Sequence, residues 1–153
     1  MRIDLEERKQ KHLKAKKLSL VLAIVCLALA VVSAVCFIFF SNYKIQLLMS
    51  IVGSIVTSLL AIAAIGFFVA GYLYNKYLYN FYTQLENKEE QSLKGQIKNL
   101  EKYTTLKKGL SFLAVYINGQ EYYLVDEDMI NSFEEEKDYQ VSLRGNYVVG
   151  VEL

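Results

Sequence analysis

The sequence predicts an α+β membrane protein, in which a two-helix transmembrane hairpin and a short helical stalk carry a small antiparallel β-barrel-like domain. Three observations support this prediction. Two long uncharged segments occupy the first half of the chain, a segment rich in tyrosine follows them, and the final part alternates apolar and polar side chains between turn signals. The 54% apolar residues are therefore concentrated in one region, which is typical of membrane proteins.

The two uncharged segments are long enough to cross a membrane. Residues 18–40 contain no charge in 23 positions, and residues 45–75 contain none in 31. A helix needs about 20 apolar residues to cross the hydrocarbon core of a bilayer. We therefore expect transmembrane helices over 18–40 and 46–74, joined by a short extracytoplasmic link over 41–45.

Two other interpretations of these segments fit less well. The rest of the chain is too small to cover two helices that are apolar on all sides, as a soluble core would require. A cleaved signal peptide has an apolar region of about 7–15 residues, and the first segment is much longer. We expect this segment to remain in the protein as an anchor.

The distribution of lysine and arginine predicts the orientation of the hairpin. Seven basic residues lie within 1–17, whereas the link contains only Lys44. Cytoplasmic flanks of membrane helices retain positive charge, so both termini of a multi-pass cell-membrane protein are expected in the cytoplasm. The basic N-terminal segment, 1–17, would be attracted to an anionic leaflet of the lipid bilayer.

The second helix carries small and hydroxyl side chains at four-residue spacing. It has no ionisable residue of the kind that marks a transport or proton path. Small residues at this period let helix backbones approach closely, so this face is expected to pack on the first helix, bind a partner's helix or form a homo-oligomer. The residues are Ser50, Gly53, Ser54, Thr57, Ser58, Ala61, Gly66 and Ala70.

Five tyrosines follow the second apolar segment: Tyr72, Tyr74, Tyr77, Tyr79 and Tyr82. Tyrosine is enriched at membrane interfaces, so this collar predicts an interfacial belt. At about 1.5 Å per residue, a helix from Leu47 has crossed the membrane by Gly71, and the last two tyrosines should lie beyond the belt. We expect the β domain, the N-terminal segment or a second copy to cover them. The helix is predicted to continue as a stalk over 75–94.

The segment 95–153 predicts two β-hairpins. Asn118-Gly119 is the strongest short-range signal for a two-residue type I′ turn. Pairing across it sets Ile117 opposite Gln120, Val115 opposite Tyr122, and Leu113 opposite Leu124. A second hairpin joins the alternating stretch "DYQVSL" to "YVVGVEL" through "RGN". The stretch 95–104 fits either a first strand or the end of the preceding helix.

Four or five short strands should close on one another as a small OB-like or SH3-like barrel, because an isolated hairpin is marginally stable. The chain resembles the short NfeD-type membrane proteins in its plan of a membrane hairpin followed by a small barrel. Two stretches also resemble them, namely "TTLKKG" at 104–109 and "VVGVEL" at 148–153. That resemblance implies an OB barrel as the C-terminal domain. It concerns architecture and a few residues, and it implies no activity for this chain.

An acidic loop separates the two hairpins. Its carboxylates could bind a basic segment of another protein: Asp126, Glu127, Asp128, Glu134, Glu135 and Glu136. The spacing does not match a calcium loop, which needs glycine at its sixth position, where Asn131 stands. A looser divalent-ion site is a weaker alternative. Met129, Ile130 and Phe133 are expected to place one helical turn over the open end of the barrel.

No catalytic, cofactor or metal site is predicted. The only histidine, His12, lies in the basic N-terminal segment, and the chain has no phosphate-binding glycine loop or nucleophile motif. Cys26 and Cys36 are about 280° apart on one helix and cannot pair with each other. Residues 109–153 hold nine acidic and two basic residues, which argues against nucleic acid despite the barrel tyrosines Tyr116, Tyr122, Tyr123 and Tyr147.

These features favour a membrane scaffold or accessory subunit, not an enzyme. Its cytoplasmic barrel would bind another membrane or cytosolic protein through the acidic loop and exposed tyrosines. One alternative is a membrane-active or protective hairpin, such as a holin-like or toxin-immunity protein. Another is a small pore-forming oligomer lined by Ser50, Ser54, Thr57 and Ser58.

Overall fold

The computed structural model describes residues 2–39, 46–98, 104–107, 110–134 and 137–152. The chain forms two compact units. One is the helical hairpin, Glu6–Phe81, and the other is a β unit that combines Met1–Leu5 with Tyr82–Leu153. The predicted link at 41–45 lies outside the described residues.

Two long helical segments form the hairpin. The first is α1, Leu5–Phe39, and the second runs through α2 (Gln46–Gly66), the π-helix η1 (Phe67–Leu73) and α3 (Tyr74–Glu86). The chain contains no proline, so no ring interrupts the helical hydrogen bonds. Both segments are long and apolar enough to span a membrane.

Helix α1 begins well before the apolar segment. Glu6 forms an ion pair with Lys9, and its Oε1 accepts a hydrogen bond of 3.0 Å from Gln10. Such pairs at spacings of three and four residues stabilise a helix, as do acidic residues in its first turn. The predicted basic N-terminal segment is therefore helical from Leu5, and its lysines lie on turns continuous with the apolar segment.

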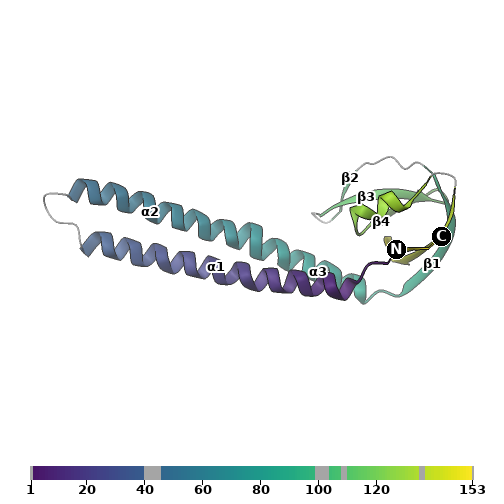
Figure 1. Ribbon diagram of the computed structural model, residues 1–153, viewed down its shortest axis with the longest axis horizontal. Helices are drawn as coiled ribbons and strands as arrows, with labels where there is room; N and C mark the ends of the chain where they lie inside the picture. The colour runs from purple at the N-terminus through teal and green to yellow at the C-terminus, as the bar shows by residue number, and fades with distance from the viewer. Residues whose placement is uncertain (1, 40–45, 99–103, 108–109, 135–136, 153) are drawn as a thin grey trace. The chain divides into compact units, whose positions relative to one another are not determined.

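The two helices of the hairpin lie side by side (Figure 1). Small residues are buried on both of them: Ala23 and Ala30 on α1, and Ala64 on α2. The large apolar side chains point away, and Leu18, Ile62 and Phe39 are 62%, 65% and 80% exposed. The hairpin thus buries small side chains and leaves its bulky apolar ones uncovered.

The predicted helical stalk is too long. Helix α3 ends at Glu86, whereas the stalk was expected to reach Lys94, and strand β1 occupies Glu90–Lys98. Leu93 packs against the β core and Ile97 is fully buried, while Lys94 is exposed. Pairing with β5 along seven residues overrides the local charge pattern that favoured a helix, because strand formation depends on cross-strand neighbours.

The remaining strands are β2 (Thr104–Lys107), β3 (Leu110–Ile117), β4 (Gln120–Leu124), β5 (Asp138–Arg144) and β6 (Tyr147–Glu152). The order β1-β5-β6-β4-β3 closes into a five-stranded barrel because the end of β3 pairs with β1. Strand β2 pairs with the first half of β3, outside the closed ring. Among the described strands, β4 and β6 form the parallel pair, and the other pairs are antiparallel.

Both predicted hairpins are confirmed. Strands β3 and β4 pair in the expected register, with Ile117 opposite Gln120 and Leu113 opposite Leu124. Asn118 and Gly119 have φ angles of 52° and 80°, as a type I′ turn requires. In the second hairpin, Gly145 has a φ of 64° in the turn between β5 and β6.

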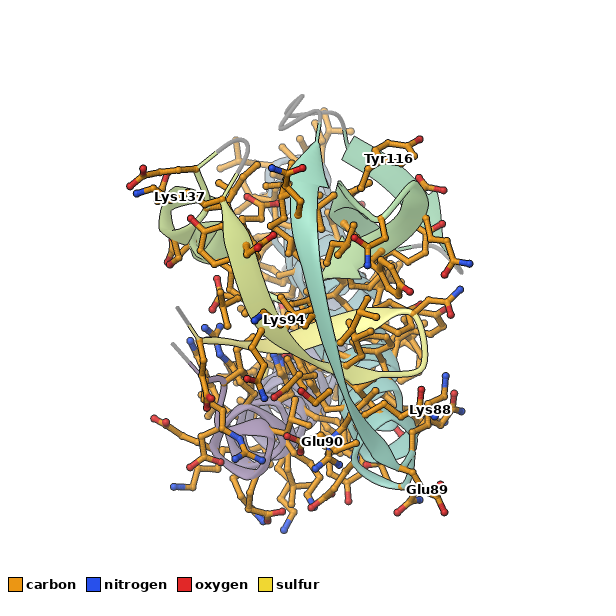
Figure 2. All side chains as sticks on the ribbon, turned by 90° about the vertical axis from the view of Figure 1, so that its right-hand side faces the viewer. Lys88, Glu89, Glu90, Lys94, Tyr116 and Lys137 are labelled. Carbon is orange, nitrogen blue, oxygen red and sulfur yellow. The ribbon has the colours of Figure 1, made fainter. Side chains whose placement is uncertain are left out.

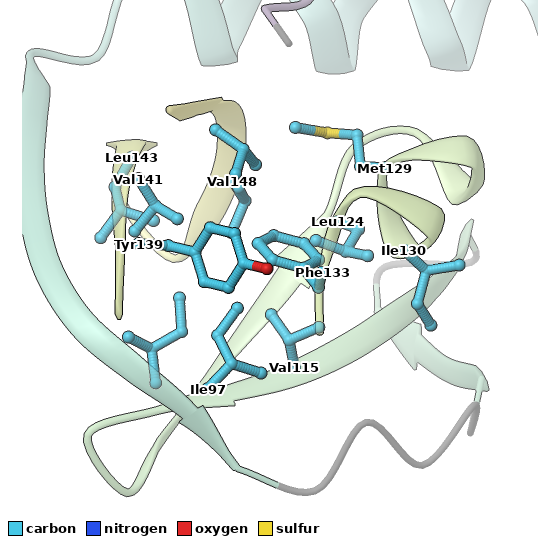
Figure 3. Packing of buried hydrophobic residues seen from close by; sticks show 12 residues of the cluster. Ile97, Val115, Leu124, Met129, Ile130, Phe133, Tyr139, Val141, Leu143 and Val148 are labelled. Atoms are coloured by element: carbon cyan, nitrogen blue, oxygen red, sulfur yellow. The ribbon is translucent and has the colours of Figure 1, made fainter. Parts of the chain in front are cut away.

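Alternate residues of the strands fill the barrel (Figure 3). Val115, Val141, Val148 and Ile97 are fully buried, and the ring of Phe133 lies edge-on to Tyr139 at 5.3 Å between centroids. The 3₁₀-helix η2, Glu127–Ser132, adds Met129 and Ile130 to this core. The expected helical turn over the barrel is therefore present, and it supplies apolar side chains to the interior.

Replacing Gly119 with valine is predicted to destabilise the barrel by about 1–2 kcal/mol, because a side chain with a Cβ is strained at positive φ. Thermal unfolding of the detergent-solubilised full chain, followed by tyrosine circular dichroism, measures the loss. Asn118→Gly is the control and should change little, since glycine tolerates this conformation. Equal losses in the two variants would contradict the type I′ turn.

Candidate functional site

The small residues of the second helix divide into two sets. Gly53 lies against α1, because a Cβ added there would be 2.5 Å from Cγ of Phe37. Thr57 donates a hydrogen bond of 3.5 Å to Ser33 on α1. Ser50, Ser54 and Ser58 are exposed. One row therefore packs within the hairpin, and the serine row stays uncovered.

A groove of about 600 Å³ lies beside the serine row. It is lined by Ala34, Phe37 and Ile38 from α1, and by Ser50, Gly53, Ser54, Thr57 and Ser58 from α2. The predicted row also included Ala61, which is half-buried, and Gly66 and Ala70, which are exposed. Nothing lies within 4 Å of a Cβ added at Gly66, so this glycine does not serve close packing within the hairpin.

A polar site that the sequence did not predict joins α1 to the start of α3. Nδ2 of Asn75 donates a 2.7 Å hydrogen bond to the carbonyl of Gly71, in η1. Its Oδ1 lies 2.9 Å from Nδ1 of His12, so the network requires a proton on that ring nitrogen. The sequence placed His12 in the basic N-terminal segment and gave it no partner. The sequence signal was weak, namely an asparagine at the end of an uncharged run.

The collar tyrosines have different surroundings. Tyr74 and Tyr77 are exposed, and Tyr72 stacks on Phe68 at 5.3 Å. Nζ of Lys16 lies 4.8 Å from the ring centroid of Tyr79, within the range of a cation–π interaction. Tyr82 is 7% exposed. The expectation that the last two tyrosines are covered is confirmed, and the N-terminal segment contributes the cover of Tyr79.

The acidic loop begins as predicted but packs through its apolar residues. Asp126 caps η2, accepting a 3.1 Å hydrogen bond from the amide of Asp128. Glu127, Asp128 and Glu134 are exposed, whereas Glu135 and Glu136 lie outside the described residues. In the described part of the chain, no group of three or more His, Cys, Asp or Glu residues could hold a metal ion. Glu127 and Asp128 begin η2, which we call the plug helix, and Glu134 follows it. We call these three exposed carboxylates the acidic rim; that of Glu134 pairs with Lys137.

The barrel tyrosines are not the open surface that was expected. Tyr123 is 6% exposed, and Tyr116, Tyr122 and Tyr147 are half-buried. Tyr123 and Tyr147 lie on the face opposite the core together with Phe112, and their ring centroids are 5.3–6.5 Å apart. Nζ of Lys88 lies 5.7 Å from the Tyr147 ring. These rings pack as a second apolar cluster, which leaves little of them for a partner.

The N-terminal segment forms part of the β unit. The amide of Ile3 donates a 2.9 Å hydrogen bond to Val149, and Arg2 pairs with Gly150 of β6. The Arg2 guanidinium also bonds both oxygens of Glu90, at 2.9 and 2.8 Å. We call residues 2–3 the N-terminal strap. No sequence pattern marks it, because two residues are too few to show strand alternation.

Glu90 holds the strap by charge. Partial burial alone would raise the pKa of its carboxyl, but the hydrogen bond from Arg144 and the charges of Arg2 and Arg144 outweigh this and lower it. Figure 2 shows Glu90 near Lys88 and Glu89, at the opposite end of the barrel from Lys137 and Tyr116. Arg2 and Arg144 each form an ion pair with Glu90, and these three residues act as a structural clamp on the strap.

Comparison with known proteins gives no match: no protein-family model, no curated protein and no solved structure is significantly similar to this chain. The likeness to NfeD-type proteins therefore stays a likeness of plan.

Substituting Gly53 with valine is predicted to destabilise the hairpin by about 1–3 kcal/mol, because the new side chain meets Phe37 close to the backbone. Detergent-titrated unfolding of the full chain, followed by far-UV circular dichroism, reports this loss. Gly66→Val is a matched control, since that position has open space. If Gly66→Val is as harmful as Gly53→Val, the close approach of the helices is wrong.

The strap should loosen in acid. Because folding lowers the pKa of Glu90, its contribution is complete above its ordinary pKa of about 4.5 and is lost as pH falls through the lower folded value. Hydrogen exchange at the Ile3 amide measures this. Glu90→Gln should speed exchange at neutral pH by up to about fivefold, as an exposed ion pair contributes at most about 1 kcal/mol.

The neighbouring Glu89 provides the control for the strap. It is exposed, and Glu89→Gln leaves the two arginine contacts of Glu90 in place. Exchange at Ile3 should then be unchanged. A similar acceleration in both variants would show that general charge, and not this clamp, holds the strap.

Proposed function

We propose that this chain is a two-span membrane protein that anchors a small OB-type barrel at the cytoplasmic face, where the barrel binds another protein as a scaffold or accessory subunit. The observation that carries the proposal is the division of the chain into an uncovered apolar hairpin and a separately folded barrel unit. Such a division fits an anchor and a presented domain better than it fits an enzyme.

Exposure of the hairpin supports the membrane assignment. In the most apolar stretch of each helical segment, 11% of the residues are buried. The core helix of a soluble protein would be mostly buried, whereas a helix in lipid keeps its bulky apolar side chains in the hydrocarbon. The length of α1, at about 1.5 Å per residue, also exceeds the thickness of a bilayer core of about 30 Å.

The strap supports the proposal that both ends of the chain lie on the same side of the membrane. Residues 2–3 bond to β6 near the C-terminal end, so both ends of the hairpin connect to one folded unit. The basic residues of 1–17 place that side in the cytoplasm, because flanks rich in lysine and arginine are retained there. The barrel would then face cytosolic proteins.

The strand order supports the OB assignment. The closed ring has five strands with one parallel pair, β4 with β6, and a short helix between β4 and β5 covers the interior. OB folds are small five-stranded Greek-key barrels that present a binding face. Here Glu127, Asp128 and Glu134 form one exposed acidic surface of the barrel, in which Glu134 pairs with Lys137. Such a surface suits a basic segment of a protein partner and not nucleic acid.

The binding claim predicts that charge on the rim is required. The full chain, purified in mild detergent, should capture a partner, and the triple variant Glu127→Gln/Asp128→Asn/Glu134→Gln should lose it by at least tenfold. The control Glu89→Gln/Asp138→Asn/Glu152→Gln removes three exposed acidic charges elsewhere on the barrel. Capture that survives the rim variant, or falls equally in the control, contradicts this role for the rim.

A second candidate, self-assembly of the hairpin, is favoured by the exposed serine row. Hydroxyl groups in hydrocarbon gain from bonding across helices, by about 1 kcal/mol or less each. In a background with Cys26→Ala and Cys36→Ala, Ser54→Cys should then crosslink two copies, whereas Ile55→Cys, on another exposed face, should not. Crosslinking at neither position would leave the monomeric scaffold as the better account.

A further inference from the structure

The basic residues at the start of α1 divide between two faces of the helix. His12 and Lys16 lie on the inner face, where they contact Asn75 and Tyr79. Lys11, Lys14 and Lys17 are exposed, and no ion pair engages them among the described residues. At 100° per residue these three lysines cover about 120° of the helix surface. They form one outward row, which we call the lysine row.

The lysine row continues directly into the apolar surface of the hairpin. Leu18, Val21 and Ile24 follow the three lysines by seven residues each, so they lie on the same faces, about 10 Å farther along the axis. These apolar side chains are 62%, 56% and 58% exposed. Whatever covers Leu18, Val21 and Ile24 therefore meets the lysine row next.

We propose that Lys11, Lys14 and Lys17 bind the phosphate groups of acidic lipids at the cytoplasmic surface of the bilayer. The inference rests on the proposed function, in which lipid covers the apolar face. The headgroup layer is about 5–7 Å thick, so Lys17 and Lys14 lie within it. Lys11, about 10 Å before Leu18 along the axis, lies beyond the layer and reaches it through its long side chain. A lysine near an anionic membrane surface contributes about 1 kcal/mol, or about fivefold in affinity.

Neighbouring charges do not cancel this attraction. Glu6 is engaged by Lys9 and Gln10. Glu7 lies four residues before Lys11, about 6 Å along the axis, and offsets part of the charge of that lysine. It lies about 10 Å before Lys14. At physiological salt this distance exceeds the screening length of about 8 Å. The inner cations are occupied differently, since Lys16 lies over the ring of Tyr79. The lysine row therefore binds lipid, whereas Lys16, on the inner face of the helix, helps to hold the hairpin together.

The test measures lipid preference of the reconstituted full chain. The chain is reconstituted into vesicles of phosphatidylcholine and phosphatidylglycerol that contain a spin-labelled form of one lipid or the other. Electron paramagnetic resonance measures how strongly each labelled lipid associates with the protein, and the ratio of the two values is the lipid preference. The unmodified chain should prefer phosphatidylglycerol. The variant Lys11→Gln/Lys14→Gln/Lys17→Gln should lower this preference by about fivefold or more, and 1 M salt should have a similar effect.

The matched control removes three exposed lysines of the barrel, Lys88→Gln/Lys94→Gln/Lys137→Gln. It changes net charge equally and should keep the preference. If the lysine-row variant keeps the preference for phosphatidylglycerol, or if the control variant loses as much of it, the lysine row is not the lipid-binding surface. Alkaline extraction of the same vesicles separates a failure of membrane anchoring from a failure of lipid binding. Release of the protein would contradict both membrane anchoring and this inference. A protein that stays inserted but shows no lipid preference would contradict only the inference.

Discussion

The pairing of the N-terminal strap with β6 is the interaction on which the organisation of this protein depends. One backbone hydrogen bond from Ile3 to Val149 and the bonds from Arg2 to Glu90 bring the first residues into the β unit. The chain therefore enters and leaves the hairpin from the same folded unit.

The charges of the chain follow from that arrangement. Of the basic residues in the first helical turns, His12 and Lys16 contact Asn75 and Tyr79 within the hairpin, whereas the lysine row is exposed. The acidic side chains gather instead on the barrel, around the plug helix, where Glu127 and Asp128 are exposed. The chain is near neutral as a whole, with 17 basic and 16 acidic residues, and its lysine row and its acidic rim belong to different units.

Local patterns were sufficient for some elements and not for others. The Asn118-Gly119 turn and the alternation in β5 and β6 depend on neighbours in sequence, so both hairpins could be predicted, and the register of the first as well. Strand β1 could not, because Leu93 and Ile97 fit a helix as well as a strand until β5 lies beside them. The strap and the bond between His12 and Asn75 depend on contacts between distant residues, which a single sequence does not display. The buried cluster of Phe112, Tyr123 and Tyr147 was missed for the same reason, since strand alternation predicted an open face.

The most direct test of the whole account is the accessibility of single cysteines in cells, after Cys26 and Cys36 are replaced by alanine. A hydrophilic maleimide should label Asn42→Cys, between the two apolar segments, in intact cells, and should label Gln120→Cys, in the β3–β4 turn region, only after permeabilisation. That result would place the barrel in the cytoplasm and the hairpin across the membrane. Labelling of both positions in intact cells, or of Gln120→Cys alone, would contradict the account.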